Sequence, residues 1–146
     1  MTQVISNSES HRRTRLDHAA ETAEDYVEAV ADILDRRETC RVTDLAQRFA
    51  VSHVTVHRIV ERLKNEGLIS AEPYKPMTLT PKGRHLAAEC RKRHEIVYRF
   101  LLALGVDEQT AAIDAEGIEH HVSPTTLQRF AAFVGHSDAN EAGGET

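Results

Sequence analysis

The sequence contains no tryptophan, and aromatic residues make up only 5% of its 146 residues. The hydrophobic core must therefore be built mainly from Leu, Ile, Val and Ala. No apolar run approaches the roughly 20 residues that a membrane-spanning helix needs, and the N-terminus lacks the apolar segment of a secretory signal. We therefore expect a protein of the cytoplasm with no membrane partner.

Cysteine is also scarce, since only Cys40 and Cys90 are present and they form no CxxC pattern. Isolated thiols of this kind indicate neither a disulfide framework nor a zinc site, so we interpret them as reduced residues without a special role. Hydrophobic residues account for 40% and charged residues for 28%, which is typical of a soluble globular chain rather than a disordered one. The length fits one domain, or a small domain with an appendage.

The formal net charge of −5 is unevenly distributed along the chain. Residues 53–93 contain nine Lys or Arg against four Glu, which gives +5, whereas residues 1–52 carry −3 and residues 94–146 carry −7. A basic middle between acidic flanks favours a surface that faces a polyanion. Ordinary solvated charge explains the same distribution equally well.

The first half of the chain shows helical periodicity. We expect residues 1–14 to be a mobile arm and a first helix to begin near Arg15. Residues 42–49 and 53–66 are predicted to form two short helices joined by a tight turn, with Ser52 as the N-cap of the second. This arrangement is typical of a helix-turn-helix unit. A plain helical hairpin gives the same pattern.

The next segment favours the helix-turn-helix. Gly67 ends the preceding helix, and residues 68–72 and 77–80 read as two short strands on either side of a turn that contains Pro73 and Pro76. A helix-turn-helix followed by a β-hairpin is a winged helix.

We therefore predict a winged-helix DNA-binding domain over residues 15–82 that binds double-stranded DNA. The second short helix would enter the major groove, where Thr55 can also contact a thymine methyl. Arg62 and Lys64 are expected to contact phosphates, which position a protein without reading the sequence, and Lys75 is expected to meet the DNA backbone from the hairpin tip. The candidate DNA-binding residues are His53, Thr55, His57, Arg58, Arg62, Lys64 and Lys75.

The second half of the chain is predicted to be helical. A long helix is expected from Pro81 to Leu104, and residues 83–136 form a second domain before a flexible tail over residues 137–146. Ser123 is the expected N-cap of the last helix. The residues of that helix expected to face inward are Leu127, Phe130, Ala131 and Phe133.

Within this half, the segment Asp114–Val122 is rich in possible metal ligands. On a helix, Glu116, Glu119 and His120 are separated by three and four residues and share one face. Two carboxylates and an imidazole on one face form either half of a metal site or a costly cluster of like charge.

Three further groups are less specific when taken alone. Asp25 and Glu28 form a carboxylate pair on the first helix, but exposed acids of this kind are usually only solvated. His94 lies in the long helix, where a lone histidine is more often a hydrogen-bonded structural residue than a ligand.

Taken together and in this order, four features resemble the manganese transport regulators, a branch of the diphtheria-toxin-repressor family of metal-dependent transcriptional regulators. They are the segment Asp25–Glu28, the winged helix, Arg93-His94-Glu95 and the segment Glu116–Val122. The resemblance extends from about Asp25 to about Phe133. It implies a mainly α-helical homodimer in which a winged helix-turn-helix precedes a helical metal-binding and dimerisation domain.

The resemblance also implies a binuclear Mn²⁺ centre with two ions per subunit, in which Fe²⁺, Co²⁺ or Zn²⁺ can substitute. Four carboxylates in one place repel each other unless cations compensate them, and oxygen-rich ligation with two imidazoles suits Mn²⁺. Iron-type relatives carry Met and Cys where Asp25 and Glu119 stand here, and a barrel domain that we do not expect in this chain. The implied ligands are Asp25, Glu28, His94, Glu116, Glu119 and His120.

The implied function is a manganese-responsive repressor of manganese uptake genes, not an enzyme, with no organic substrate. An iron-responsive regulator of the same family is the nearest alternative. A carboxylate-bridged di-metal enzyme or storage bundle is a second, but neither His94 nor His120 has the Glu three residues earlier that such bundles use. A winged-helix sensor of an organic ligand leaves the six ligand-type residues unexplained.

Overall fold

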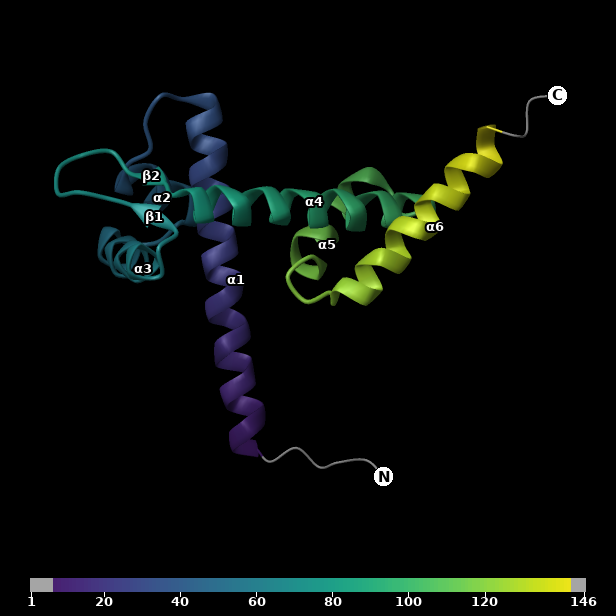
Figure 1. Ribbon diagram of the computed structural model, residues 1–146, viewed down its shortest axis with the longest axis horizontal. Coiled ribbons are helices and arrows are strands. Elements are labelled where there is room, and N and C mark those ends of the chain that lie inside the picture. Colours follow the sequence, from purple (N-terminus) through teal and green to yellow (C-terminus); the bar gives the residue numbers. More distant parts are fainter. Residues whose placement is uncertain (1–6, 143–146) are drawn as a thin grey trace. The chain divides into compact units, whose positions relative to one another are not determined.

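The computed structural model describes residues 7–142 of the chain, which divide into two compact units between Ala87 and Ala88. The predicted fold class is confirmed: a winged helix-turn-helix is followed by a helical domain (Figure 1). No described helix is both long and apolar enough to cross a membrane. The elements are α1 (Asn7–Arg36), α2 (Val42–Phe49), α3 (His53–Asn65), β1 (Ile69–Ser70), β2 (Thr78–Leu79), α4 (Pro81–Ala103), α5 (Glu108–Ile118) and α6 (Pro124–Ala142).

Both ends of the described chain are more helical than the sequence predicted. Residues 7–14, expected to belong to a mobile arm, form the first two turns of α1. The side chains there are exposed, and Thr14 Oγ1 donates a hydrogen bond to the Ser10 carbonyl at 3.0 Å. At the other end, α6 continues to Ala142 through much of the predicted tail. The remaining parts of the arm and tail, residues 1–6 and 143–146, lie outside the described residues.

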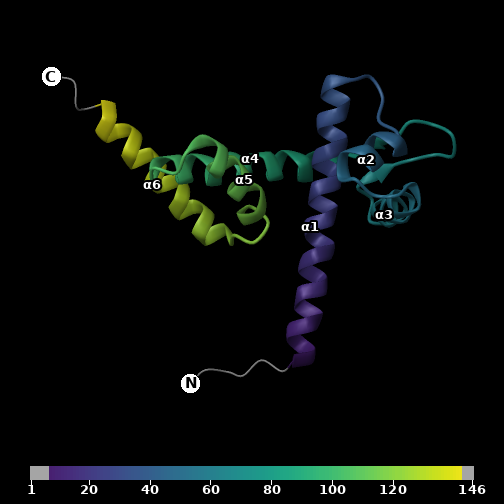
Figure 2. The same ribbon diagram turned by 180° about the vertical axis from the view of Figure 1, so that it is seen from behind.

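The core of the first unit is formed where α1 packs on the helix-turn-helix. Apolar residues recur along α1 at helical spacing, and Tyr26, Val27, Val30 and Ile33 are all buried. The Tyr26 ring stacks on the Phe49 ring of α2, with centroids 4.4 Å apart. Figures 1 and 2 show α2, α3 and the β-hairpin on the same side of α1. The buried face of α1 therefore fixes the orientation of the helix-turn-helix.

The turn between α2 and α3 is formed as predicted. Ala50 ends α2 in the left-handed conformation, at φ 52°, and its N–H reaches the last carbonyls of the helix. Ser52 is the N-cap of α3, because its Oγ accepts a hydrogen bond from the backbone N–H of Thr55 at 3.1 Å.

The hairpin has shorter strands than predicted but the expected pairing. β1 and β2 are antiparallel, with Ile69 opposite Leu79 and Ser70 opposite Thr78. Ile69 and Leu79 are buried on one face, while Ser70 and Thr78 are exposed on the other. The Met77 N–H also donates to the Cys40 carbonyl at 3.0 Å. The hairpin is thus anchored to the segment between α1 and α2.

Gly83 allows the start of α4 to approach the backbone of Leu68, the residue before β1, closely. A Cβ atom at this position would lie 2.0 Å from the Leu68 carbonyl oxygen, so the backbone would have to move. We predict that Gly83→Ala lowers the free energy of unfolding by about 1–3 kcal/mol, the usual cost of overpacking. Gly135→Ala in α6 is the matched control: nothing lies within 4 Å of its new Cβ, so it should stabilise by roughly 0.5–1 kcal/mol. Urea denaturation measures both, and a neutral Gly83→Ala would contradict the close approach.

The second unit is held by contacts between α4 and α6. The Phe100 and Phe130 rings stack with centroids 3.9 Å apart. Ser123 caps α6 as predicted, with its Oγ accepting from the Thr126 N–H at 3.2 Å. The expected inward position of Ala131 and Phe133 is wrong, since both are exposed. The covered apolar residues are spaced by three and four along α6, and they are Leu127, Phe130 and Val134.

Phe133 is exposed because a spacing of six from Leu127 turns it away from the covered stripe. An edge-on contact with the Phe100 ring, at 5.5 Å between centroids, covers part of its surface.

Candidate DNA-binding surface and metal centre

The N-terminal half of α3 presents an exposed polar face. His53, His57 and Arg58 are exposed, as is Lys64 further along the helix. The His53 Nε2 atom lies 3.5 Å from the Thr43 hydroxyl of α2. The N-terminal half of α3 therefore carries cations and hydrogen-bonding groups of the kind that contact DNA when a helix enters the major groove.

Other residues predicted to contact DNA are engaged within the protein. The Thr55 hydroxyl lies 3.0 Å from the Ser52 hydroxyl, and Thr55 is half-buried. The Arg62 Nη2 donates to the Ala19 carbonyl of α1 at 3.0 Å. The Lys75 ammonium lies 2.8 Å from the Glu72 carboxylate, but both side chains are largely exposed. An exposed ion pair of this kind is weak and leaves Lys75 able to bind a phosphate.

Two exposed side chains were missed by sequence reasoning. Val54 is 78% exposed on α3, and Tyr74 is fully exposed at the hairpin tip. Tyr74 has φ 62°, a conformation uncommon for a bulky residue. Val54 could have been found from the sequence, because it is an apolar residue within the polar face of α3.

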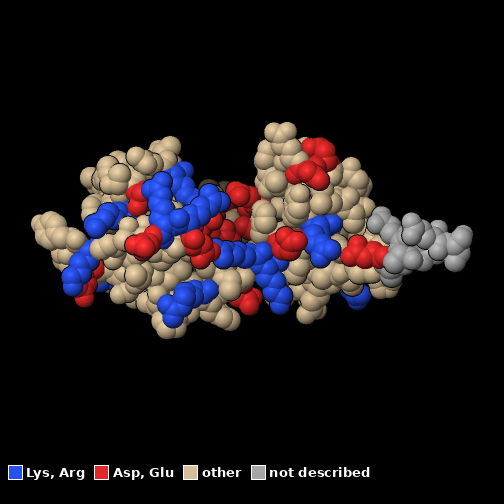
Figure 3. Space-filling view, turned by 90° about the horizontal axis from the view of Figure 1, so that it is seen from above, with Lys and Arg blue, Asp and Glu red and all other residues tan. Residues whose placement is uncertain are grey.

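A groove of about 670 Å³ separates α3 from the hairpin. His57 and Lys64 line one side, while Tyr74 and Lys75 line the other. Glu61 and Glu72 also reach it, so the lining is of mixed charge. Figure 3 shows the same mixture on the surface seen from above, where Lys and Arg lie among Asp and Glu. The groove and this face of the surface therefore both carry charges of both signs.

The ligand-rich segment of the second unit does not remain helical throughout. α5 ends at Ile118, and Glu119 is its C-cap, with its N–H donating to the Ala115 carbonyl at 3.0 Å. His120 lies in the turn that follows. The prediction that all three of Glu116, Glu119 and His120 lie on one helix is therefore wrong, because His120 lies beyond its end. Pro124 at the start of α6 disfavours helical backbone in the residue before it, so α5 and α6 do not form one continuous helix.

The burial of the two glutamates differs sharply. Glu119 is 2% exposed and is the one buried charged residue within the described part of the chain, whereas Glu116 is exposed. Ala111 and Ala115 precede Glu119 at intervals of four and are also fully buried. The small alanine side chains let this face of α5 approach its neighbours closely, which encloses the Glu119 carboxylate.

The Glu119 carboxylate lies between two imidazoles. Its Oε2 is 3.2 Å from the His94 Nδ1 of α4, and its Oε1 is 3.4 Å from the His120 Nε2. A buried carboxylate is costly unless it is hydrogen-bonded or paired with a cation. One carboxylate and two imidazoles are also a donor set for a divalent first-row metal ion. The residues of this cluster therefore fit a metal ion by their chemistry.

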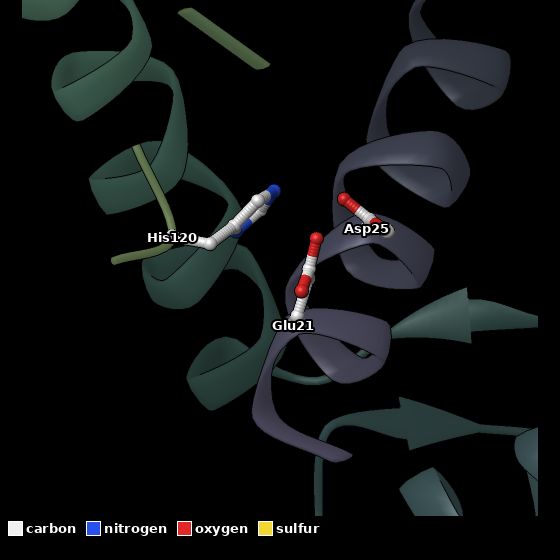
Figure 4. A group of neighbouring side chains, drawn as sticks. All are labelled: Glu21, Asp25 and His120. Atoms are coloured by element: carbon white, nitrogen blue, oxygen red, sulfur yellow. The ribbon is translucent and has the colours of Figure 1, made fainter. Parts of the chain in front are cut away.

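The first unit carries possible ligand carboxylates on α1. Asp25 and Glu28 are half-buried on this helix. Glu21, one turn before Asp25, was not predicted, and oxygens of these two carboxylates lie within 4.8 Å of each other. Figure 4 shows Glu21 and Asp25 on successive turns of α1, and it also labels His120 of the second unit. Glu21 could have been found from the sequence, because it precedes Asp25 by four residues and so lies on the same face of the helix.

The six predicted ligands are therefore distributed over both units. Asp25 and Glu28 belong to α1, whereas the other four belong to the second unit. There the structure brings His94, Glu119 and His120 together. A winged helix followed by a helical unit with a buried carboxylate–imidazole cluster defines a class: DNA-binding regulators that respond to a metal ion.

The comparisons with known proteins agree with this class. Residues 18–77 match the family described as iron dependent repressor, N-terminal DNA binding domain, and residues 80–146 match its metal binding and dimerisation domain. The chain belongs to this iron-dependent repressor family, which confirms the resemblance noted from the sequence. The family and the names of its relatives indicate a transcriptional regulator rather than an enzyme.

Individual relatives indicate which branch of the family the chain is similar to. The chain is 43% identical to the transcriptional regulator MntR of Salmonella typhimurium over 134 residues, which cover 92% of this chain and 85% of the relative. It is 33% identical to the HTH-type transcriptional regulator MntR of Bacillus subtilis, covering 82% and 84%. A solved manganese-dependent transcriptional repressor in complex with manganese matches with a TM-score of 0.70 and 29% identity, covering 77% of this chain. The match covers 52% of that solved chain, so this protein corresponds to about half of it.

Proposed function

We propose that this protein is a manganese-responsive transcriptional repressor that acts in the cytoplasm and controls manganese uptake genes. The observation that carries the proposal is the buried Glu119 carboxylate between His94 and His120 in a chain that begins with a winged helix. The relatives named MntR and the solved manganese-dependent repressor support Mn²⁺ as the metal. The family supports DNA as the partner.

The proposed metal centre joins ligands from both units. Asp25 and Glu28 of α1 would complete the set formed by His94, Glu116, Glu119 and His120, and four carboxylates would balance the charge of two divalent ions. Burial, with a contribution from Asp44, raises the pKa of the Cys40 thiol to about 11, so this sulfur remains protonated and is a poor metal ligand near neutral pH. The oxygen-rich set suits Mn²⁺, while Fe²⁺, Co²⁺ and Zn²⁺ remain able to bind it.

The mechanism follows from the position of Asp25 and Glu28. The opposite face of α1 packs in the winged-helix core, where Val27 and Val30 are fully buried. A metal ion held by these residues would supply the positive charge that offsets repulsion between the carboxylates of α1 and those of the second unit. With Asp25 and Glu28 as ligands, α1 would be fixed, and α1 in turn carries the helix-turn-helix. Metal binding and DNA binding are then coupled, and each strengthens the other.

Repression requires two recognition helices, and hence a homodimer. The family assigns dimerisation to the domain matched by residues 80–146. Leu104, Ile113 and Phe133 expose large apolar surfaces in this part of the chain, which favours their burial against a second subunit. In the dimer, the two α3 helices would enter successive major grooves about 34 Å apart. His53, Thr55, His57, Arg58, Lys64 and Lys75 are the proposed DNA contacts.

A metal titration tests the proposal against its nearest alternatives. Operator binding by the full chain is measured by fluorescence anisotropy under anaerobic conditions, with Mn²⁺, Fe²⁺ or Zn²⁺ added to metal-free protein. We expect Mn²⁺ to raise the operator affinity by about 5–150-fold, the usual range of allosteric coupling. Activation by Fe²⁺ but not by Mn²⁺ would support an iron-responsive regulator. Oxidase turnover with iron would instead support a di-metal enzyme.

A further inference from the structure

Arg62 of α3 contacts α1 through its guanidinium. Its Nη2 donates to the Ala19 carbonyl at 3.0 Å, between residues 43 positions apart in the sequence. Its Nε lies 3.5 Å from the Glu66 carboxylate, and the side chain is 38% exposed. Arg62 therefore differs from Lys64, which is exposed on the same helix. The sequence predicted both as phosphate contacts.

The acceptor lies within the body of α1 rather than at its end. As a helix residue, the Ala19 carbonyl also accepts from the N–H four residues later, and its second lone pair is available to Arg62. The contact therefore does not compete with the backbone hydrogen bonds of α1. A guanidinium is suited to this arrangement because its donors form a rigid fork, which can contact Ala19 and Glu66 together.

Ala19 is close along the helix to the proposed metal ligands. Six residues separate it from Asp25, which corresponds to about 9 Å along the helix axis. One rigid helix thus carries both the Arg62 contact and the two carboxylates proposed to respond to metal. A displacement or rotation of α1 that moves Asp25 also moves the Ala19 carbonyl.

We propose that Arg62 is a positioning residue that transmits the position of α1 to the recognition helix α3, rather than a phosphate contact. The inference rests on the proposed function, since it assigns a route by which metal at α1 changes DNA binding. Metal-dependent placement of Asp25 sets the position of the Ala19 carbonyl, and the hydrogen bond from Arg62 holds α3 in register with it.

The two roles of Arg62 predict different behaviour toward salt. Removing one phosphate contact from a DNA-binding protein lowers the slope of log affinity against log salt by about 0.9. It also weakens binding to operator and to unrelated DNA alike, with or without metal. Removing a positioning contact leaves the salt slope unchanged. It lowers instead the ratio of operator affinities measured with and without Mn²⁺.

The experiment uses the full-length homodimer and the variants Arg62→Met and Lys64→Met. Operator affinity is measured at several salt concentrations, with saturating Mn²⁺ and with metal removed. For Arg62→Met we expect an unchanged salt slope and a Mn²⁺-dependent affinity ratio reduced by about threefold or more, a substantial part of a typical coupling. For Lys64→Met we expect a lower salt slope and an unchanged ratio. A lower slope with an unchanged ratio in Arg62→Met would overturn the inference.

Arg62→Lys guards against a loss of folding in the methionine variant. Lysine keeps the positive charge but lacks the forked donors of the guanidinium. If Arg62 is a positioning residue, Arg62→Lys should reduce the response of operator affinity to Mn²⁺ and keep the salt slope of the wild type. If Arg62 is a phosphate contact, Arg62→Lys should behave nearly as the wild type. Circular dichroism checks that each variant is folded. Failure of the proposed function is recognised separately, because the unmodified protein would then show no response to Mn²⁺. A normal wild-type response with no change of ratio in Arg62→Lys would refute the role of Arg62 alone.

Discussion

Glu119→Gln is expected to lower the affinity for Mn²⁺ by at least a factor of about 10 to 100, which is the effect of losing even an outer-shell partner of a metal site. Glutamine keeps the shape of the side chain but replaces an anionic oxygen by an uncharged amide. The Glu119 oxygens lie 3.2 and 3.4 Å from the two imidazoles, so the change falls within the cluster. Isothermal titration calorimetry on the metal-free protein measures the loss.

If Glu119 had a structural role and were not a metal ligand, Glu119→Gln would instead lower the stability of the metal-free protein. A buried carboxylate is costly unless it is paired with a cation, so a neutral amide of the same shape need not destabilise the metal-free protein. We therefore expect Glu119→Gln to bind Mn²⁺ poorly without a large loss in the free energy of unfolding of the metal-free protein. Asp114→Asn, an exposed carboxylate on α5, is the matched control and should bind Mn²⁺ normally. Unchanged Mn²⁺ affinity in Glu119→Gln would remove this residue from the ligand set.

Asp25→Asn is expected to separate metal binding from DNA binding. The second unit keeps His94, Glu119 and His120, so the variant should still bind Mn²⁺, with its affinity lowered by about tenfold. α1 has then lost a ligand, and saturating Mn²⁺ should no longer raise the operator affinity to the wild-type level. Calorimetry and fluorescence anisotropy on the same protein preparation measure the two effects.

The control for Asp25 is Asp17→Asn, a neutralised carboxylate on the exposed N-terminal part of α1. It changes the charge of the same helix by the same amount, so it corrects for general electrostatic effects on DNA binding. We expect its metal response to equal that of the wild type. If Asp25→Asn responds as strongly as Asp17→Asn, the link between α1 and the metal centre is incorrect.

Much of the fold was predictable because local signals agreed with one another. α2 has the predicted limits, Ser52 and Ser123 cap their helices, and the hairpin pairs as expected. Helix ends were less predictable, since the polar first turns of α1 carry no apolar periodicity. The position of Phe133 depended on which parts of α6 are covered, and only tertiary packing decides that.

The metal centre was predictable in its residue types but not in its geometry. Residue spacing alone placed Glu119 and His120 on a helix, whereas the helix ends before them and the following turn directs His120 toward Glu119. The approach of His94 could not be derived from spacing, because it lies on another helix. The Arg62 contact with Ala19 was equally hidden, since a basic residue on a recognition helix resembles a phosphate contact until its neighbours are known.

Operator binding by metal-free protein at physiological salt tests the central claim most directly. The full chain is stripped of metal, its affinity for operator DNA is measured by fluorescence anisotropy, and Mn²⁺ is then added to the same sample. The account predicts weak binding without metal and an increase by about 5–150-fold when Mn²⁺ is present. Equally tight, sequence-specific binding with and without Mn²⁺ would contradict it.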